Sequence, residues 1–137
     1  MTKARLLIVD DEKININLLV SLFKEDYELV IAKDGTQALN RAKEQRPDLA
    51  LLDIVLPDVD GYHVFQQLQA LFDDTIPVIF ITSKRDPEEE IIGLTLGAVD
   101  YITKPFNQEL VKLRVEQQVE HIKIKNQLKA LLSEGAG

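Results

Sequence analysis

Three aspartates in this sequence stand where apolar segments end, in positions that suit metal-dependent chemistry. Asp10 and Asp11 follow the apolar residues 6–9, and Asp53 follows the apolar residues 49–52. A carboxylate inside an apolar run is costly unless it is paired, coordinated or placed at the open end of the run. If the two segments are neighbouring strands, their three carboxylates meet at one edge of a sheet.

Carboxylates held this close raise one another's pKa, and a divalent cation relieves the repulsion. Mg²⁺ prefers hard oxygen ligands and keeps positions for water or a phosphate. Two more polar candidates follow later apolar segments, the hydroxyl of Thr82 and the ammonium of Lys104. Acids, a cation, a lysine and a hydroxyl together suit transfer of a phosphoryl group, with an aspartate as nucleophile.

The elements that must position these groups alternate along the chain. Short β-branched apolar runs predict strands, and apolar residues at helical spacing predict helices. The expected strands are 4–10, 27–33, 48–53, 76–82 and 99–103, and the expected helices are 12–26, 36–46, 62–73, 85–97 and 107–134.

Five strand–helix units predict an α/β fold with a parallel sheet, helices on both faces and right-handed crossovers. The expected form is a flavodoxin-like, doubly wound five-stranded sheet of order 2-1-3-4-5 with an extended C-terminal helix. Ligands bind outside the carboxyl ends of such strands, where the winding reverses. The three aspartates would converge there, which accounts for the position of Asp53.

These motifs resemble the receiver domain of bacterial two-component response regulators. The resemblance covers residues 4–120 and rests on the acidic pair, on Asp53 with "LPDVDG" after it, on Thr82, and on "GAVDYITKPF" around Lys104. It implies that Asp53 accepts a phosphoryl group from a sensor histidine kinase or phosphotransfer protein. The protein would then be a phosphorylation-dependent switch and not an enzyme, apart from its own phosphorylation and slow self-dephosphorylation.

The resemblance also implies a ligand set for Mg²⁺. Asp11, Asp53 and the main-chain carbonyl of Val55 would bind the ion directly, and Asp10 would act through water. Val55 has no side-chain group that could orient an attacking water. Slow hydrolysis of the phosphoryl group is therefore expected.

The remaining implied roles lie near the fourth and fifth strands. Thr82 and Lys104 would contact the phosphoryl oxygens, and Tyr101 matches the aromatic switch residue that turns inward when Thr82 moves. The bond between Lys104 and Pro105 matches one that is usually cis in receivers.

Other readings of the acids are less consistent with the sequence. A flavodoxin-like FMN protein needs a phosphate loop after its first strand, where this chain has "DDEKININ". An aspartyl-phosphate phosphatase of the haloacid dehalogenase type needs D-x-D-x-T, whereas the acids here are adjacent. An EF-hand around "PDVDG" lacks its remaining ligands, because Leu56 and Gln67 occupy those positions. A degenerate receiver that only binds partners usually lacks one of the key positions, and this chain has them all.

Two groups of titratable residues have simpler interpretations. Asp86 to Glu90 predict a helix start, with Asp86 as N-cap, Pro87 at N1 and Glu89 as capping-box partner. His63 and His121 are isolated histidines on expected helices. A phosphotransfer histidine needs a helical bundle and a supporting acid, so we interpret both as surface or packing residues.

Composition indicates a single globular domain. The chain has 137 residues, 45% of them hydrophobic, a net charge of −7 and no cysteine. No signal peptide or membrane-spanning run is evident, so we expect a cytoplasmic protein without a membrane partner. The acidic charge argues against direct nucleic-acid binding.

The fifth helix is longer than a receiver needs. We predict a receiver domain over residues 1–120 and an extension over residues 121–137 that acts as a stalk or linker. Val111, Val115 and Val119 suit packing on the sheet, and Ile124, Leu128 and Leu131 continue as a coiled-coil seam.

Extended backward, the same register places polar residues on the seam: Arg114, Gln117 and His121. Residues 107–137 carry five Lys or Arg against four Glu, which does not suit a basic nucleic-acid helix. We predict a weak homodimer through this helix and an unidentified effector. The alternative is that the extension frays or folds back on its own domain.

Overall fold

The computed structural model describes residues 3–136, so the outermost residues of the two predicted segments, 1, 2 and 137, lie outside the described residues. Strands and helices alternate as the sequence predicts. They are β1 (Arg5–Val9), α1 (Lys13–Phe23), β2 (Glu28–Ala32), α2 (Gly35–Glu44), β3 (Leu49–Leu52), α3 (Gly61–Ala70), β4 (Val78–Thr82), α4 (Pro87–Leu96), β5 (Asp100–Thr103) and α5 (Gln108–Ala136).

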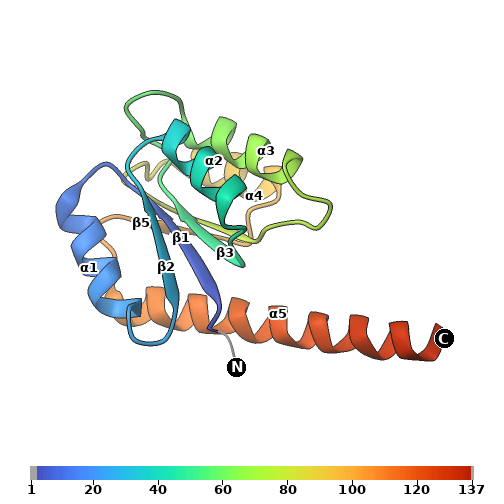
Figure 1. The fold of residues 1–137 in the computed structure, drawn as a ribbon. Coiled ribbons are helices and arrows are strands. Elements are labelled where there is room, and N and C mark those ends of the chain that lie inside the picture. The colour runs from blue at the N-terminus through green and yellow to red at the C-terminus, as the bar shows by residue number, and fades with distance from the viewer. Residues whose placement is uncertain (1–2, 137) are drawn as a thin grey trace.

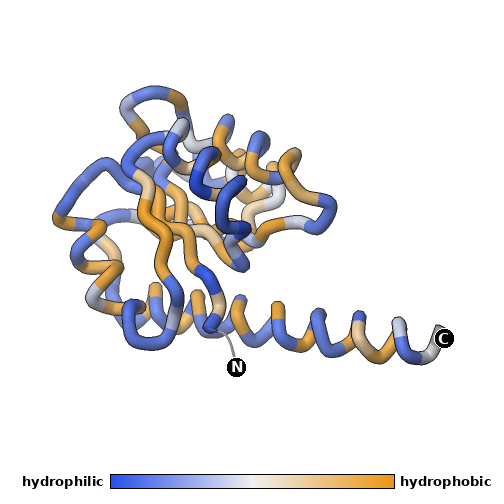
Figure 2. Tube along the Cα trace, viewed as in Figure 1, coloured by the Kyte–Doolittle hydropathy of each residue, from blue (hydrophilic) through white to orange (hydrophobic). Residues whose placement is uncertain are grey.

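The strands form one parallel sheet of order β2-β1-β3-β4-β5, which confirms the predicted topology. Helices α1 and α5 cover one face, and α2, α3 and α4 cover the other (Figure 1). A sheet covered on both faces needs apolar side chains on both, so its strands are almost continuously hydrophobic (Figure 2). The order reverses at β1 and β3, whose carboxyl ends carry the candidate acids.

Two hydrophobic cores hold the layers together. One contains Phe80, Val64 and Leu68 among its buried residues, under α2, α3 and α4. The other contains Phe23 and Ile8, under α1 and α5. Their interlocked side chains fix the strand ends to which the polar groups are attached.

Helix α3 begins close against β3. A Cβ on Gly61 would clash with the carbonyl oxygen of Asp53, so only glycine permits this approach. Asp60 caps the helix by accepting a hydrogen bond from the His63 amide at 2.9 Å. The chain that follows Asp53 is thereby held against the sheet.

Helix α4 begins as predicted at Pro87, with Asp86 as N-cap, but the predicted capping box is wrong. The Asp86 side chain makes no capping hydrogen bond. The Glu89 carboxylate instead accepts from the Tyr62 hydroxyl and lies 3.4 Å from Nζ of Lys84. Partners on α3 and on the β4–α4 loop have replaced the local contact that the sequence pattern favours.

Helix α5 runs through residue 120 without a break. Val111 and Val115 are buried, and Val119 and Ile122 pack at the edge of the same core. Within residues 3–136, no helix combines the length and apolar character needed to cross a bilayer.

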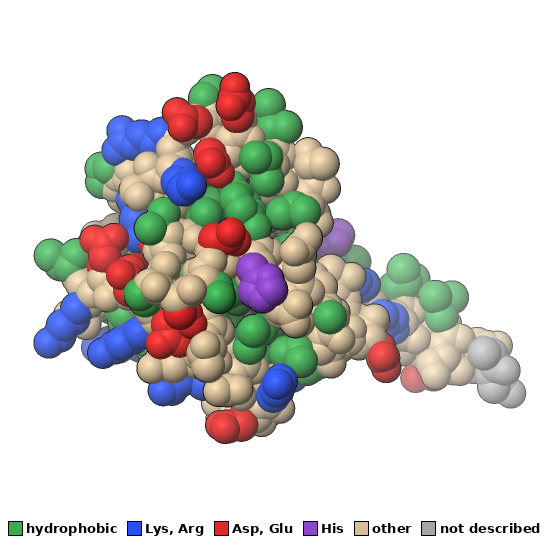
Figure 3. Space-filling model, turned by 90° about the horizontal axis from the view of Figure 1, so that it is seen from above, with side chains coloured by type: hydrophobic (Ala, Val, Ile, Leu, Met, Phe, Trp, Pro, Cys, Tyr) green, Lys and Arg blue, Asp and Glu red, His purple; other side chains and the backbone are tan. Residues whose placement is uncertain are grey.

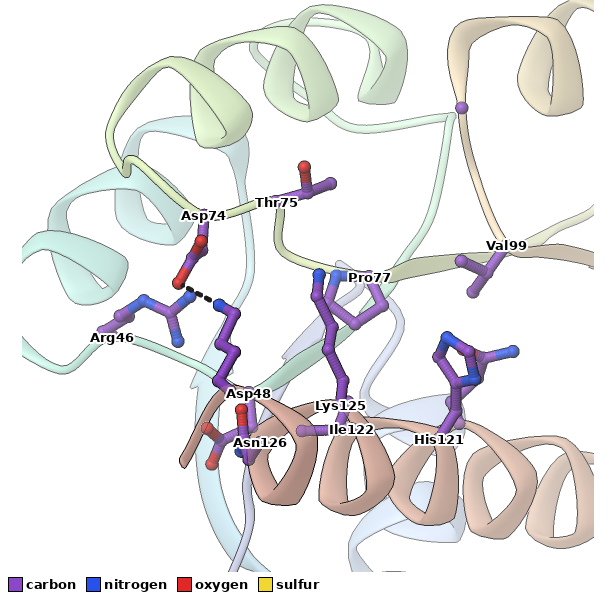
Figure 4. A pocket seen from close by; sticks show the side chains of 13 residues that line it. Arg46, Asp48, Asp74, Thr75, Pro77, Val99, His121, Ile122, Lys125 and Asn126 are labelled. Atoms are coloured by element: carbon purple, nitrogen blue, oxygen red, sulfur yellow. Dashed lines mark hydrogen bonds and ion pairs between the residues drawn. The ribbon is translucent and has the colours of Figure 1, made fainter. Parts of the chain in front are cut away.

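The next turns of α5 lie under the amino ends of β3, β4 and β5. They close a pocket of about 240 Å³ lined by Arg46, Asp48, Asp74, Thr75, Pro77, Gly97, Val99, Gln118, His121, Ile122, Lys125, Asn126 and Lys129. The carboxylate of Asp74 lies 2.8 Å from Nζ of Lys129 (Figure 4). The helix therefore contacts its own domain well past residue 120.

The opposite side of α5 is uncovered. Ile124, Leu128 and Leu131 are 55%, 56% and 65% exposed. Hydrophobic side chains are visible on the projecting end of the helix in Figure 3. The apolar part of the predicted seam is thus accessible in the single chain. In its polar part, Arg114 pairs with Asp100 at 3.3 Å and His121 lines the pocket under α5.

Candidate functional site

The acids predicted at the strand ends meet in one cluster. Ligand oxygens of Asp10, Asp11, Glu12 and Asp53 lie within 4.8 Å of one another. Asp10 and Asp53 are 2% and 3% exposed, whereas Asp11 and Glu12 are exposed. The sheet positions the two buried acids, since the Asp53 amide donates to the Val9 carbonyl at 3.0 Å.

Lys104 reaches this cluster from the end of β5. Its Nζ lies 2.7 Å from Oδ2 of Asp10 and 2.7 Å from Oδ2 of Asp53, with Glu12 at 3.3 Å. Burial alone would lower the Lys104 pKa, but the hydrogen bonds to the two aspartates outweigh it and hold the pKa above its ordinary value. Lys104 therefore carries its positive charge between two buried carboxylates.

The second oxygen of each buried acid is held by the backbone. Oδ1 of Asp53 accepts from the Val55 amide at 3.0 Å, and Oδ1 of Asp10 accepts from the Glu12 amide at 2.9 Å. Burial raises the pKa of Asp10 above its ordinary value, although the Lys104 hydrogen bond opposes this. These contacts fix the orientation of both carboxylates.

The donor set fits a divalent cation of the Mg²⁺ type. The cluster holds four carboxylates and one ammonium, which contacts three of them, so it keeps an excess of negative charge. Its oxygens are hard ligands, and the exposed Asp11 and Glu12 leave an approach from solvent. The family resemblance did not single out Glu12, although its place directly after the acidic pair is a usable signal.

The predicted switch residues border the same site. Thr82 is fully buried, and its hydroxyl lies 3.4 Å from the Lys84 amide. Tyr101 is also buried, and its hydroxyl donates to the Lys84 carbonyl at 2.8 Å. Burial, then the charges of nearby glutamates, raises the pKa of Tyr101 to about 12. The peptide bond between Lys104 and Pro105 is cis.

The loop after Asp53 is anchored by Asp58, a residue to which the sequence analysis assigned no role. Asp58 accepts from the amides of Gly35 and Thr36 at 2.8 and 2.9 Å, and from the Thr36 hydroxyl at 2.9 Å. The Gly35 hydrogen bond leads the causes that hold the Asp58 pKa well below its ordinary value. Asp58 thus caps α2 from the β3–α3 loop.

A shallow hollow lies beside the loop that follows Asp53. Val55 and Lys84 both line it, from the β3–α3 and β4–α4 loops. Val55 is 48% exposed, and its side chain offers no hydrogen-bonding group to a water molecule there. The pocket under α5 lies at the opposite ends of the strands, away from the acidic cluster.

Comparison with known proteins agrees with the resemblance to receiver domains. The family model described as "Response regulator receiver domain" matches residues 6–116. The "Alkaline phosphatase synthesis transcriptional regulatory protein PhoP" of Bacillus subtilis is 40% identical over 115 residues, covering 82% of this chain and 47% of that protein.

A protein of Vibrio cholerae named "Probable cyclic di-GMP phosphodiesterase" is 38% identical over 127 residues, covering 92% of this chain and 29% of that protein. The chain thus spans less than half the length of these two relatives.

A crystal structure of a CheY-like receiver domain protein from Methanospirillum hungatei superposes with a TM-score of 0.83 at 26% identity, covering 90% of this chain and 99% of that one. Fold, acidic cluster and sequence similarity agree, and the chain belongs to the response regulator receiver domains of two-component signalling.

Proposed function

We propose that this receiver is a phosphorylation-dependent switch whose phosphoacceptor is Asp53. The observation that carries the proposal is the contact of one ammonium with two buried carboxylates, Lys104 with Asp10 and Asp53, each at 2.7 Å. Asp53 is oriented by a backbone amide and lies next to the solvent-facing Asp11 and Glu12. A buried, oriented carboxylate beside a fixed cation is suited to act as a nucleophile.

The proposed step joins a carboxylate oxygen of Asp53 to the phosphorus of a phosphohistidine on a sensor kinase or phosphotransfer protein. The phosphorus–nitrogen bond breaks, and the departing imidazole keeps the electron pair of that bond and takes up a proton. Lys104 neutralises charge on the transferred oxygens, and Thr82 offers them a hydroxyl. Hydrolysis later joins water to phosphorus, releases inorganic phosphate and restores the carboxylate.

A bound Mg²⁺ would supply charge neutralisation and alignment of the phosphoryl oxygens. Asp11, Asp53 and the Val55 carbonyl would hold it directly, and Asp10 through water. Glu12 is a further oxygen donor at the exposed rim. The same carboxylates would repel a phosphoryl donor without such a cation.

The output is proposed to pass through Thr82 and Tyr101. Both contact the backbone of Lys84, so a movement of Thr82 toward a phosphoryl group alters the loop that anchors Tyr101. Phosphorylation would then shift a two-state equilibrium, not create a new fold.

The partners are proposed on the same basis. Residues 1–120 act as the receiver, in the cytoplasm, and the segment 121–137 links it to an effector. The exposed seam of α5 supports a weak homodimer that phosphorylation strengthens.

We propose no direct nucleic-acid contact, because the chain has a net charge of −7. Transfer and hydrolysis are confined to its own aspartate, so it is not an enzyme in the ordinary sense.

Intact mass spectrometry after incubation with Mg²⁺ and acetyl phosphate tests the proposal. We expect one added phosphoryl group on the wild type, and none on Asp53→Asn or in the presence of EDTA. Asp73→Asn is the matched control, since Asp73 is an exposed aspartate outside the cluster. A modified Asp53→Asn protein, or a modified serine in the wild type, would contradict the assignment.

A further inference from the structure

Lys104 is held at its backbone as well as at its ammonium. Its amide donates to the Thr82 carbonyl at 2.8 Å, which continues the pairing of β5 with β4. Its carbonyl accepts from Nη2 of Arg85 at 2.6 Å. Both polar groups of this backbone unit are therefore bound to β4 or to the loop that follows it.

Of these two contacts with the Lys104 backbone, the one from Arg85 is made by a side chain. Pro105 follows Lys104 and has no amide hydrogen, so the chain cannot continue a regular backbone ladder at this point. The guanidinium of Arg85 donates to the Lys104 carbonyl across 19 positions of sequence. Arg85 itself is exposed, so it adds little to the hydrophobic core.

The same loop holds the two other polar groups that border the acceptor. Lys84 lies next to Arg85. Its carbonyl accepts a hydrogen bond from the Tyr101 hydroxyl, and its amide donates to the Thr82 hydroxyl oxygen. Residues 84 and 85 therefore contact Thr82, Tyr101 and Lys104 together. Arg85 is the member of this pair whose side chain can be replaced without removing any group that faces the phosphoryl site.

We propose that Arg85 is a positioning residue for phosphoryl transfer: by fixing the Lys104 carbonyl, it keeps the Lys104 ammonium between Asp10 and Asp53. This inference rests on the proposed function of Asp53 and adds to it a connection between the β4–α4 loop and the lysine. Without the guanidinium, the β5–α5 loop gains freedom, and the ammonium reaches the phosphoryl oxygens in fewer of its conformations.

The experiment compares Arg85→Ala and Arg85→Lys with the wild type. Arg41→Ala is the matched control, because Arg41 is an exposed arginine on α2. Hydrogen exchange of the Lys104 amide, which donates to the Thr82 carbonyl, reports on how firmly the Lys104 backbone is held and needs no phosphoryl donor. The rate of Asp53 phosphorylation by acetyl phosphate with Mg²⁺ reports on its consequence, and the melting temperature reports on overall stability.

We expect Arg85→Ala to speed exchange of the Lys104 amide and to slow phosphorylation at least about fivefold, because small misplacements of reacting groups cost up to about a hundredfold in rate. The melting temperature should stay near that of the wild type. Arg85→Lys, which keeps a donor, should recover part of both effects, and Arg41→Ala should change neither.

The outcomes separate the two proposals. If Arg85→Ala shows the wild-type exchange of the Lys104 amide and the wild-type rate of phosphorylation, the proposed role of Arg85 is overturned. Slower phosphorylation with unchanged Lys104 exchange also overturns it, because the effect then does not pass through Lys104. If the Lys104 amide exchanges faster but the rate of phosphorylation is unchanged, Arg85 holds the Lys104 backbone without positioning it for transfer, and the proposal is overturned. If the wild type takes no phosphoryl group, the function proposed for Asp53 fails, and the exchange data alone decide whether Arg85 holds Lys104.

Discussion

The ammonium of Lys104 and the carboxylate of Asp53 lie 2.7 Å apart, although the two residues are 51 positions apart in the sequence. The ammonium also binds Asp10 at 2.7 Å, so one cation balances two buried acids. Breaking such an arrangement leaves like charges facing each other in a place with little water.

Lys104→Ala should therefore lower the free energy of unfolding by about 3 kcal/mol or more without divalent cations, the cost of removing one partner of a buried pair. Mg²⁺ should restore part of the loss, since the remaining carboxylates still bind a cation. Urea unfolding with and without MgCl₂ measures both effects. Lys129→Ala is the control, because it removes an exposed ion pair that should matter little. Equal stability of Lys104→Ala and the wild type would contradict the prediction.

Asp58→Asn should weaken the attachment of the β3–α3 loop to α2, by about 1 kcal/mol at neutral pH, as for a lost helix cap. The folded-state pKa of Asp58 lies below its ordinary value of 3.8, so its stabilisation is complete above about pH 5 and declines as the pH falls through 4. Urea unfolding at pH 7 and pH 3 should show the difference between variant and wild type shrinking at the lower pH. A difference independent of pH would mean that the charge of Asp58 is not involved.

Val55→Asn should hydrolyse its phosphoryl group faster than the wild type. Val55 lines the hollow beside the loop that follows Asp53 and cannot orient a water molecule, whereas asparagine offers both a donor and an acceptor. The measurement is the decay of phosphoprotein after removal of the donor. Lys84→Ala should be run in parallel, because Lys84 lines the same hollow. Equal or faster decay in the wild type would show that Val55 does not limit the access of water.

Truncation after Glu120 should abolish self-association. The exposed Ile124, Leu128 and Leu131 lie in the deleted segment, and two apolar heptads support only a weak dimer. Sedimentation of both proteins, with and without beryllofluoride, should show a dimer only for the full chain, strengthened by the phosphoryl mimic. Leu128→Glu in the full chain should behave like the truncation. If full and truncated chains stay monomeric at high micromolar concentration, or dimerise equally, the seam is not an interface.

The sequence by itself determined the fold and the end of the sheet at which chemistry can occur. Alternating apolar runs predict the parallel sheet, and the positions of Asp10, Asp53 and Thr82 at strand ends follow from local pattern alone. Local pattern suffices here because the apolar runs and hydrophobic periodicity that mark strands and helices are properties of neighbouring residues. The bounds of α5 were likewise predictable from its continuous helical spacing.

Only the tertiary structure decided which side chains meet. The capping-box pattern at Glu89 was overridden by Tyr62 and Lys84, which belong to other elements. The cap supplied by Asp58 to α2 and the hold of Arg85 on Lys104 join residues 22 and 19 positions apart, across loops. Such contacts depend on how loops are placed once the core has packed, and neither periodicity nor propensity carries that information. For the same reason the sequence could not show that one side of α5 contacts its own domain as far as Lys129 while Ile124, Leu128 and Leu131 on the other side stay exposed.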